Sequence, residues 1–321
     1  MIEMNLQTVT QKLAWLDARY WKFGHDDLFG EYLADLYDVN DDGEMTGEPR
    51  RDPLTGETRG LMVLASSGNG KTATLRRALR AAPALKEFSP EAGGNTLFIE
   101  VPPDATIKSL AEKIAQATGY PKFDNRVGGP ERWDIARHRL ILTGITTLII
   151  DECHHIFRSG AGRDIPGAIQ ALKHMLQSDH AVALIIIGVP ELKDAILKEA
   201  SGETYRRLDE FHMPRALPGS REAAKFERCL MSCATALGVE VDPSDCFSDR
   251  FLFAEHGETG RAVKLAKDTL RRAVTKKRSR LCLEDAELLF IKNNGQPAMT
   301  PFHAGDWATV RAELEAMGWA R

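Results

Sequence analysis

The octapeptide Ala-Ser-Ser-Gly-Asn-Gly-Lys-Thr at residues 65–72 follows a short apolar run and precedes a helical pattern. Gly68 and Gly70 let the backbone turn several N–H groups toward one anion, and the start of the following helix adds positive potential. The Lys71 ammonium is expected to reach the β- and γ-phosphates of ATP, and the Thr72 hydroxyl to bind Mg²⁺. The segment therefore predicts a phosphate-binding loop. The residues expected to contact the nucleotide are Ser67, Gly68, Asn69, Gly70, Lys71 and Thr72.

The octapeptide departs from the pattern GxxxxGK[ST] at one place, because Ala65 replaces the first glycine. Alanine adds only a methyl group, so the loop is expected to keep its shape if Ala65 has a negative φ. A chance turn rich in glycine and serine is the alternative interpretation.

Short apolar runs alternate with helical patterns after residue 60. Apolar runs without polar alternation favour strands that are buried on both faces of a parallel sheet. The alternation therefore predicts an α/β fold with a doubly wound parallel sheet. The expected strands are 61–64, 96–101, 147–150 and 182–188, and the expected helices are 72–81, 106–118, 131–142 and 166–177.

Two adjacent carboxylates, Asp151 and Glu152, end the apolar run at 147–150. After a phosphate-binding loop, this is the Walker B arrangement. Asp151 is expected to hold Mg²⁺ directly or through water, and Glu152 to polarise the water that attacks the γ-phosphate. Alone, such a pair would often be only the end of a strand.

Three other patterns resemble metal sites without supporting one. A metal shared by His154 and His155 is not expected, because consecutive side chains point apart. Cys229 and Cys233 are one helical turn apart but lack a CxxC pair, so reduced thiols are expected. The segment 38–49 begins like a calcium-binding loop, but its twelfth position is a proline, which favours a solvated turn.

Three arginines are candidates for contact with the γ-phosphate. Arg206 or Arg207 would serve a neighbouring subunit as an arginine finger, unless both are solvated at a helix end. Arg261 begins a later helix and would fold over the nucleotide, coupling two domains, unless it is a surface residue. Gly188 and Val189 stand where ATPases of this kind place a polar sensor residue, so that sensor is expected to be missing.

A cluster of basic residues lies at 271–280. The whole chain has 42 Lys and Arg against 46 Asp and Glu, a net charge of −4, so contact with DNA would depend on a local patch. Such a patch neutralises phosphates without reading bases, and a solvated helix end is the equal alternative. The candidate DNA-binding residues are Arg271, Arg272, Lys276, Lys277, Arg278 and Arg280.

The apolar runs stop beyond Pro218, where helical patterns at 221–237, 244–254, 260–274 and 283–291 predict a small helical domain. Near the N-terminus, helical patterns at 3–23 and 28–36 precede a polar loop at 38–60. No apolar run is long enough for a membrane helix, and no signal peptide is evident, so a cytoplasmic protein is expected. The expected divisions are a helical extension and loop at 1–60, an ATPase domain at 61–217, a helical lid at 218–291 and a tail at 292–321.

The order of these motifs resembles that of AAA+ ATPases, which have a P-loop parallel-sheet domain followed by a C-terminal helical lid. A closer resemblance covers most of residues 1–290: IIIGVPEL at 185–192 and YRRLDEFHMPR at 205–215 are similar to segments of the TniB/TnsC family of transposition ATPases. By motif position, the resemblance gives catalytic roles to Glu152 and to Arg206 or Arg207, and a nucleotide-sensing role to Arg261.

The TniB/TnsC resemblance implies an ATPase that binds ATP and Mg²⁺ and assembles on double-stranded target DNA. It also implies recruitment of a DDE-type transposase and contact with a TniQ-like targeting protein. An arginine supplied by a neighbour requires head-to-tail contacts, which produce a ring or a helical filament of identical subunits. Two alternatives are a nucleotide-switch ATPase of signalling or defence and a replication-initiation or helicase-loading AAA+ protein. The last would favour a winged-helix DNA reader, which the pattern at 283–321 does not show.

Overall fold

The computed structural model describes residues 8–124, 126–158, 165–177, 180 and 182–319. They form two compact units. The sheet unit contains the described residues of Asp26–Ser67 and Lys71–Met213. The helical unit contains the described residues of Met1–His25 and Pro214–Arg321 together with Gly68–Gly70.

The sheet unit is built on five parallel strands in the order β4-β5-β6-β3-β7. Four strands match the apolar runs expected from the sequence. The fifth, β7, was not expected, because Asp209 and Glu210 interrupt its apolar residues, as an edge strand permits. The strands are β3 (Gly60–Leu64), β4 (Thr96–Glu100), β5 (Thr147–Asp151), β6 (Ala183–Gly188) and β7 (Leu208–His212).

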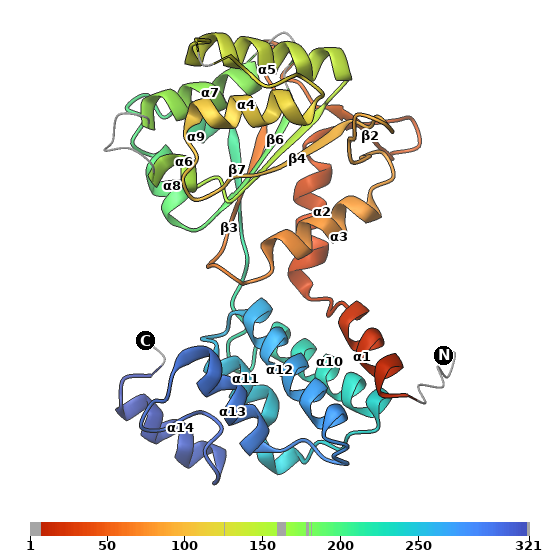
Figure 1. Ribbon diagram of the computed structural model, residues 1–321, viewed down its shortest axis with the longest axis vertical. Coiled ribbons are helices and arrows are strands. Elements are labelled where there is room, and N and C mark those ends of the chain that lie inside the picture. Colours follow the sequence, from red (N-terminus) through yellow and green to blue (C-terminus); the bar gives the residue numbers. More distant parts are fainter. Residues whose placement is uncertain (1–7, 125, 159–164, 178–179, 181, 320–321) are drawn as a thin grey trace. The chain divides into compact units, whose positions relative to one another are not determined.

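Helices cover both faces of this sheet (Figure 1). Successive strand residues alternate between the faces. Met62 and Leu64 belong to the core under α4, α5 and α7, whereas Leu61 and Val63 belong to the core under α2 and α3. The covering helices are α2 (Gly24–Ala34), α3 (Lys71–Ala81), α4 (Ile107–Ala117), α5 (Gly129–Thr143) and α7 (Ile165–Gln177). Three shorter helices are α6 (His155–Arg158), α8 (Glu191–Ile196) and α9 (Glu203–Arg206).

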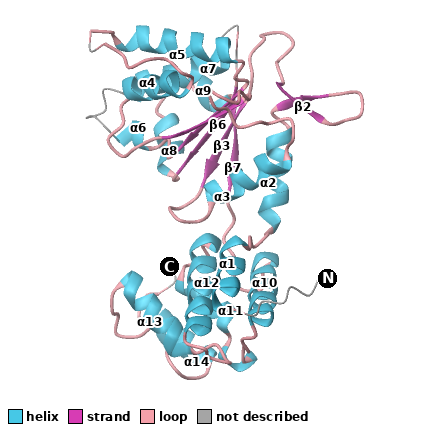
Figure 2. Cartoon of the chain, turned by 45° about the vertical axis from the view of Figure 1, so that its right-hand side comes forward, coloured by secondary structure: helices cyan, strands magenta, loops and turns pink. Residues whose placement is uncertain are grey.

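A two-stranded antiparallel hairpin stands beside the five-stranded sheet (Figure 2), where the sequence predicted only a loop. It consists of β1 (Tyr37–Val39) and β2 (Met45–Pro49). The Asn40 side-chain oxygen accepts the N–H groups of Asp42 and Glu44, at 3.1 and 2.8 Å. Asn40, one of the polar residues in the segment that resembles a calcium-binding loop, therefore stabilises the hairpin turn.

The helical unit begins with α1, which packs on α12. The helix predicted at 3–23 is shorter in the structure, and residues 3–7 lie outside the described residues. The helices of this unit are α1 (Val9–Ala18), α10 (Arg221–Leu237), α11 (Phe247–Ala254), α12 (Thr259–Thr275), α13 (Leu283–Asn294) and α14 (Trp307–Ala316), with a 3-10 turn at Pro243–Asp245. No helix in the described part of the chain is long and apolar enough to cross a membrane.

The segment after α13 completes the core of the helical unit. Phe302 is buried against Phe251 and Phe290, with ring centroids 5.3 and 6.0 Å apart. Arg250 is fully buried and donates hydrogen bonds to backbone carbonyls, most of them in this segment. The accepting carbonyls belong to Asp245, Pro301, His303 and Gly305, at 2.7, 2.6, 3.0 and 2.8 Å.

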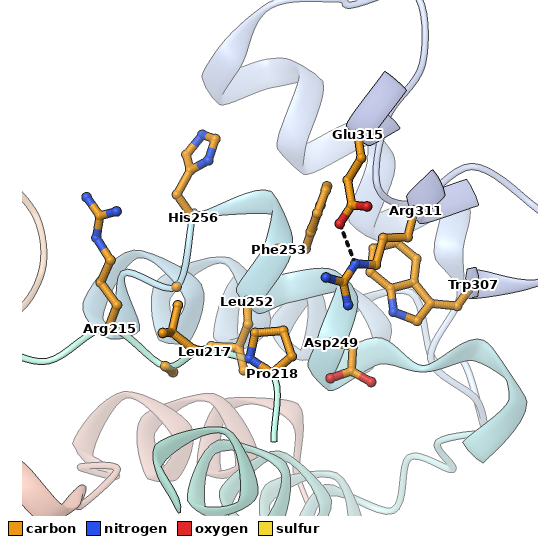
Figure 3. Close-up of a pocket in the computed structure, with 12 residues that line it drawn as sticks. Arg215, Leu217, Pro218, Asp249, Leu252, Phe253, His256, Trp307, Arg311 and Glu315 are labelled. Carbon is orange, nitrogen blue, oxygen red and sulfur yellow. Dashed lines mark hydrogen bonds and ion pairs between the residues drawn. The ribbon is translucent and has the colours of Figure 1, made fainter. Parts of the chain in front are cut away.

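A cavity of about 320 Å³ lies in the helical unit where residues 215–218 meet α11 and α14 (Figure 3). Phe253 and Trp307 line it, and Arg311 forms an ion pair with Glu315 at 2.8 Å on the same wall. None of the lining residues belongs to the predicted nucleotide site. The C-terminal segment thus supplies one wall of a cavity as well as part of the core.

We expect Arg250→Leu to destabilise the helical unit, because it leaves several buried carbonyls without a donor. The expected loss is about 3 kcal/mol, or about 10 °C in Tm. Thermal unfolding followed by circular dichroism measures it. Arg228→Leu, which changes an exposed arginine on α10, is the control and is expected to leave Tm within about 2 °C. Equal Tm values for the two variants would contradict the role assigned to Arg250.

Candidate nucleotide-binding site

The predicted phosphate-binding loop connects β3 to α3. Gly68 and Gly70 have φ values of +80° and +89°, which L-residues with a side chain rarely adopt. Among the described residues other than glycine, positive φ is confined to Glu152, Cys246, His256 and Lys277. Ala65 therefore keeps a negative φ, the condition under which the loop tolerates alanine in place of the usual first glycine.

Lys71 is the first residue of α3 and is buried. Its ammonium group donates hydrogen bonds to the carbonyl oxygens of Ala65 and Ser66, at 2.9 and 3.0 Å. The cation is thus folded onto its own loop, close to where phosphate oxygens would bind. A triphosphate would exchange these neutral carbonyl acceptors for charged ones, which form stronger hydrogen bonds.

The Thr72 hydroxyl donates to a carboxylate oxygen of Asp151 at 2.7 Å. Asp151 ends β5 and is buried. A hydroxyl and a carboxylate are hard oxygen donors of the kind that Mg²⁺ prefers, so these two residues fit the ion that accompanies ATP. When bound there, Mg²⁺ would neutralise phosphate charge, and Thr72 and Asp151 would hold it.

Glu152 follows in a strained turn, with a φ of +54°. Its backbone N–H donates to the Asp151 carboxylate at 2.8 Å. One Glu152 carboxylate oxygen lies 3.4 Å from Nδ1 of His154 and 3.9 Å from Nε2 of His155. The turn therefore places the candidate base next to the candidate Mg²⁺ ligand and against two imidazoles.

His154 and His155 do not point apart as the sequence suggested. They lie where the turn enters α6, and their ring centroids are 4.1 Å apart. His154 is 4% exposed, and burial, with smaller effects from His155, Arg158 and Lys71, lowers its pKa to about 4. His154 is therefore neutral at pH 7.

Position 188, where a polar sensor residue would be expected, has little room for any side chain. A Cβ atom there would lie 2.9 Å from a methyl of Leu192 and 3.5 Å from the Cβ of His154. The end of β6 is thus packed against Leu192 and His154.

The tip of the loop, Gly68–Gly70, belongs to the helical unit and contacts the start of α12. The Asn69 side-chain oxygen accepts the Thr259 hydroxyl and the Gly260 N–H, both at 3.2 Å. A Cβ on Gly260 would lie 2.4 Å from the carbonyl carbon of Asn69, so only glycine fits. Gly260 directly precedes Arg261, the arginine singled out from the sequence, but the sequence alone did not reveal the close approach that this glycine permits.

Arg261 lies beside the same loop tip, because a Cβ built on Gly68 would be 3.2 Å from the Arg261 Cγ. Its guanidinium pairs with Glu255 at 2.9 Å. Burial raises the pKa of Glu255 from its ordinary value. The arginine predicted to sense nucleotide is thus held by an acid that the sequence did not single out.

The comparisons agree with this geometry. Residues 55–196 match the family model for an AAA domain. The fold is that of an AAA+ ATPase. Similar solved structures are the ORC1 protein of Aeropyrum pernix in complex with DNA, the ORC2 protein of the same organism in ADPNP–ADP complexes, and Cdc6p of Pyrobaculum aerophilum.

The three structures have TM-scores of 0.60, 0.57 and 0.56 and identities of 16, 13 and 16%. The alignments cover 95, 86 and 85% of this chain and 87, 70 and 68% of the respective others. Among curated proteins, none matches the sequence. At these identities the likeness shows the AAA+ fold alone, and none of the comparisons supports the narrower TniB/TnsC subtype.

The two candidate finger arginines differ in their surroundings. Arg207 makes two hydrogen bonds to the Glu57 carboxylate, at 3.0 and 2.8 Å, and one to the Glu203 carbonyl at 2.7 Å. Arg206 is exposed and donates to the Ser201 carbonyl at 3.2 Å. Arg207 is thus engaged within its own subunit, and Arg206 is the better placed to reach another molecule.

Most residues of the predicted DNA-binding cluster are paired with acidic residues of the helical unit. Arg272 and Arg278 share Asp285, at 2.6 and 2.7 Å. Arg271 pairs with Asp17, and Arg280 pairs with Asp242 and Asp245. Lys276 and Lys277 are exposed at the end of α12. The arginines therefore serve ion pairs within the helical unit, which leaves the two lysines as the simpler candidates for phosphate contact.

We expect Lys71→Ala to weaken ATP binding by about 30- to 100-fold, because it removes a charged donor to the phosphates. Glu152→Gln is expected to keep ATP affinity within about threefold and to slow hydrolysis by about 10²–10⁴. Fluorescent ATP titration and phosphate release measure the two effects. Lys108→Ala, at an exposed position of α4, is the control. An equal loss of binding in the Lys71 and Glu152 variants would contradict these roles.

Proposed function

We propose that this protein is an ATPase that assembles head to tail on duplex DNA, with ATP bound between neighbouring subunits. The observation that carries the proposal is the placement of Lys71, Thr72, Asp151 and Glu152 at one end of the sheet with an exposed arginine at the other. The AAA+ fold supports nucleotide hydrolysis in general, and the DNA-bound ORC1 neighbour supports action on DNA.

In the proposed reaction, Lys71 binds the terminal phosphates while Thr72 and Asp151 hold the metal that accompanies them. Glu152 orients the attacking water and accepts its proton. The neighbour's arginine offsets the charge that develops on the transferred phosphoryl group. Release of phosphate removes the charge that joins the two subunits and loosens the contact.

Strand register supports the proposal that the arginine acts between subunits. In the parallel pair β3–β7, Gly60 lies opposite Leu208 and Leu64 opposite His212. Arg206 therefore precedes the start of β7, whereas the phosphate-binding loop follows the end of β3. Five strand residues separate the two levels, which is about 16 Å. This distance supports an arginine that serves the ATP of a neighbour and not its own.

We expect Arg206→Ala to reduce hydrolysis by about 10³-fold while ATP still binds. Mixing it with Lys71→Ala should restore part of the activity, because an intact Arg206 of one subunit then faces an intact loop of another. Steady-state phosphate release measures both effects. Arg207→Ala, the neighbouring control, is expected to lower Tm through loss of the Glu57 pair. Full activity of Arg206→Ala would contradict its assignment as the finger.

Replication initiation or helicase loading is the cellular role that the structural neighbours favour, since all three are ORC or Cdc6 proteins. Within the described residues 213–319, no strand follows β7, so a winged-helix DNA reader is not part of that segment. DNA contact would then come from other parts of the assembly, including the end of α12.

Regulation of transposition is the second candidate, and the segments 185–192 and 205–215 favour it. They lie on β6 and α8 and on α9 and β7, which include the exposed Arg206. In this role the ATP-bound assembly would recruit a DDE-type transposase and contact a TniQ-like protein. An integrase-fold transposase gene beside the gene for this protein would favour transposition over replication initiation.

We expect the protein to assemble on duplex DNA in the presence of ATP and Mg²⁺, as measured by fluorescence anisotropy and electron microscopy. Replacing both Lys276 and Lys277 by alanine should make the negative slope of log affinity against log salt concentration shallower by about 2 for each subunit that contacts DNA. Lys108→Ala paired with Lys122→Ala is the matched control. ATP binding without DNA assembly would contradict the proposal and favour a nucleotide switch.

A further inference from the structure

We propose that Glu152, His154 and His155 form a binding site for a divalent transition-metal ion, with Zn²⁺ as the expected occupant. The site is separate from the Mg²⁺ position at Thr72 and Asp151. A bound ion would take the carboxylate of Glu152 and so stop hydrolysis. Metal binding stands on the geometry of the turn alone, whereas inhibition of hydrolysis rests on the proposed function.

The three side chains each offer one ligand atom, and these atoms all lie within 4.8 Å of one another. Nδ1 of His154 is 3.4 Å from the Glu152 carboxylate oxygen, and Nε2 of His155 is 3.9 Å from the same oxygen. Ligand atoms around tetrahedral zinc are about 3.3 Å apart, given metal–ligand bonds of about 2.0–2.1 Å. The first pair is thus already at this spacing, and a small side-chain movement brings in His155.

His154 has a buried ring nitrogen without a hydrogen-bond partner. The residue is 4% exposed, and its Nδ1 is one of the buried polar atoms in the described residues that lack such a partner. Buried polar atoms are nearly always satisfied, so an exception calls for an explanation. A metal ion bound to this nitrogen supplies one.

The backbone holds the ligands in a tight turn. The N–H of Cys153 donates to the Ile187 carbonyl at 2.8 Å, which ties the turn to β6, and the N–H of His155 donates to the Glu152 carbonyl at 3.0 Å. Glu152 has a positive φ within this turn. Ligands fixed by the backbone lose little entropy when a metal binds, which favours affinity.

The donor set favours Zn²⁺ over Mg²⁺. Two imidazole nitrogens and one carboxylate oxygen match zinc sites that keep a fourth position for water. Mg²⁺ prefers oxygen ligands in octahedral geometry and gains little from imidazole. The two neighbouring sites would therefore select different ions. While zinc holds the Glu152 carboxylate, that group cannot accept the proton of the attacking water.

Metal binding is tested with the metal-free full-length protein in the absence of nucleotide. Co²⁺ is the probe, because four-coordinate Co²⁺ absorbs visible light far more strongly than the aqua ion. We expect one Co²⁺ per chain, displaced by one Zn²⁺. His155→Asn and Glu152→Gln should each weaken binding by about tenfold or more. His154→Asn should do the same if circular dichroism shows that it folds. His138→Asn, an exposed histidine on α5, is the control and should bind like the parent.

Unchanged Co²⁺ binding in both His155→Asn and Glu152→Gln would overturn the proposal, and so would a parent protein that does not raise the visible absorption above that of free Co²⁺. Equal weakening in His138→Asn would also overturn it, because binding would then reflect scattered surface histidines.

Inhibition is tested separately, by phosphate release with excess Mg²⁺-ATP and increasing Zn²⁺. We expect Zn²⁺ to abolish hydrolysis and a zinc chelator to restore it. With each rate expressed relative to that of the same protein without Zn²⁺, His155→Asn should need about tenfold more Zn²⁺ for the same inhibition. A protein that binds Co²⁺ but hydrolyses no ATP would contradict the proposed function and leave the metal site standing. A protein that hydrolyses ATP with unchanged Zn²⁺ sensitivity in His155→Asn would contradict inhibition through this site.

Discussion

The hydrogen bond between Thr72 and Asp151 joins the two parts of the candidate nucleotide site. Thr72 is the second residue of α3, which follows β3 and the phosphate-binding loop, and Asp151 ends β5. In the sheet, β6 lies between β3 and β5. All strands of this sheet are parallel, so their carboxyl ends lie at one edge. The bond therefore depends on strand order and register together. It places an oxygen pair suited to a hard cation beside the ammonium of Lys71.

Much of the fold could be predicted because it depends on local pattern. Unbroken apolar runs predicted β3, β4, β5 and β6, since strands covered on both faces have no polar alternation. The pattern could not predict β7, an edge strand whose Asp209 and Glu210 are tolerated where one side of the strand is unpaired. It also could not predict the hairpin at 37–49, because polar turn residues are common to loops and to hairpins.

The motifs of the candidate site could be predicted from the sequence, but the acidic residues that pair with its arginines could not. The octapeptide and the Asp-Glu pair could be found because their chemistry lies in consecutive residues. Glu255 and Glu57 could not, because each meets its arginine only through tertiary contact. The same limit applied to the basic cluster at 271–280. A run of like charges predicts a patch, and only the folded chain reveals that acids from three other segments neutralise its arginines.

The separation of Arg206 from its own phosphate-binding loop has a consequence for any open array of the proposed kind. Every internal nucleotide is served by a neighbour's guanidinium, but one terminal subunit has a loop with no arginine to complete it. That last ATP would persist after the others are spent, so the two ends of the array would differ in lifetime. If the catalytic parts are divided between opposite edges of the sheet as proposed, the two ends of the assembly would differ in how long they keep ATP as well as in structure.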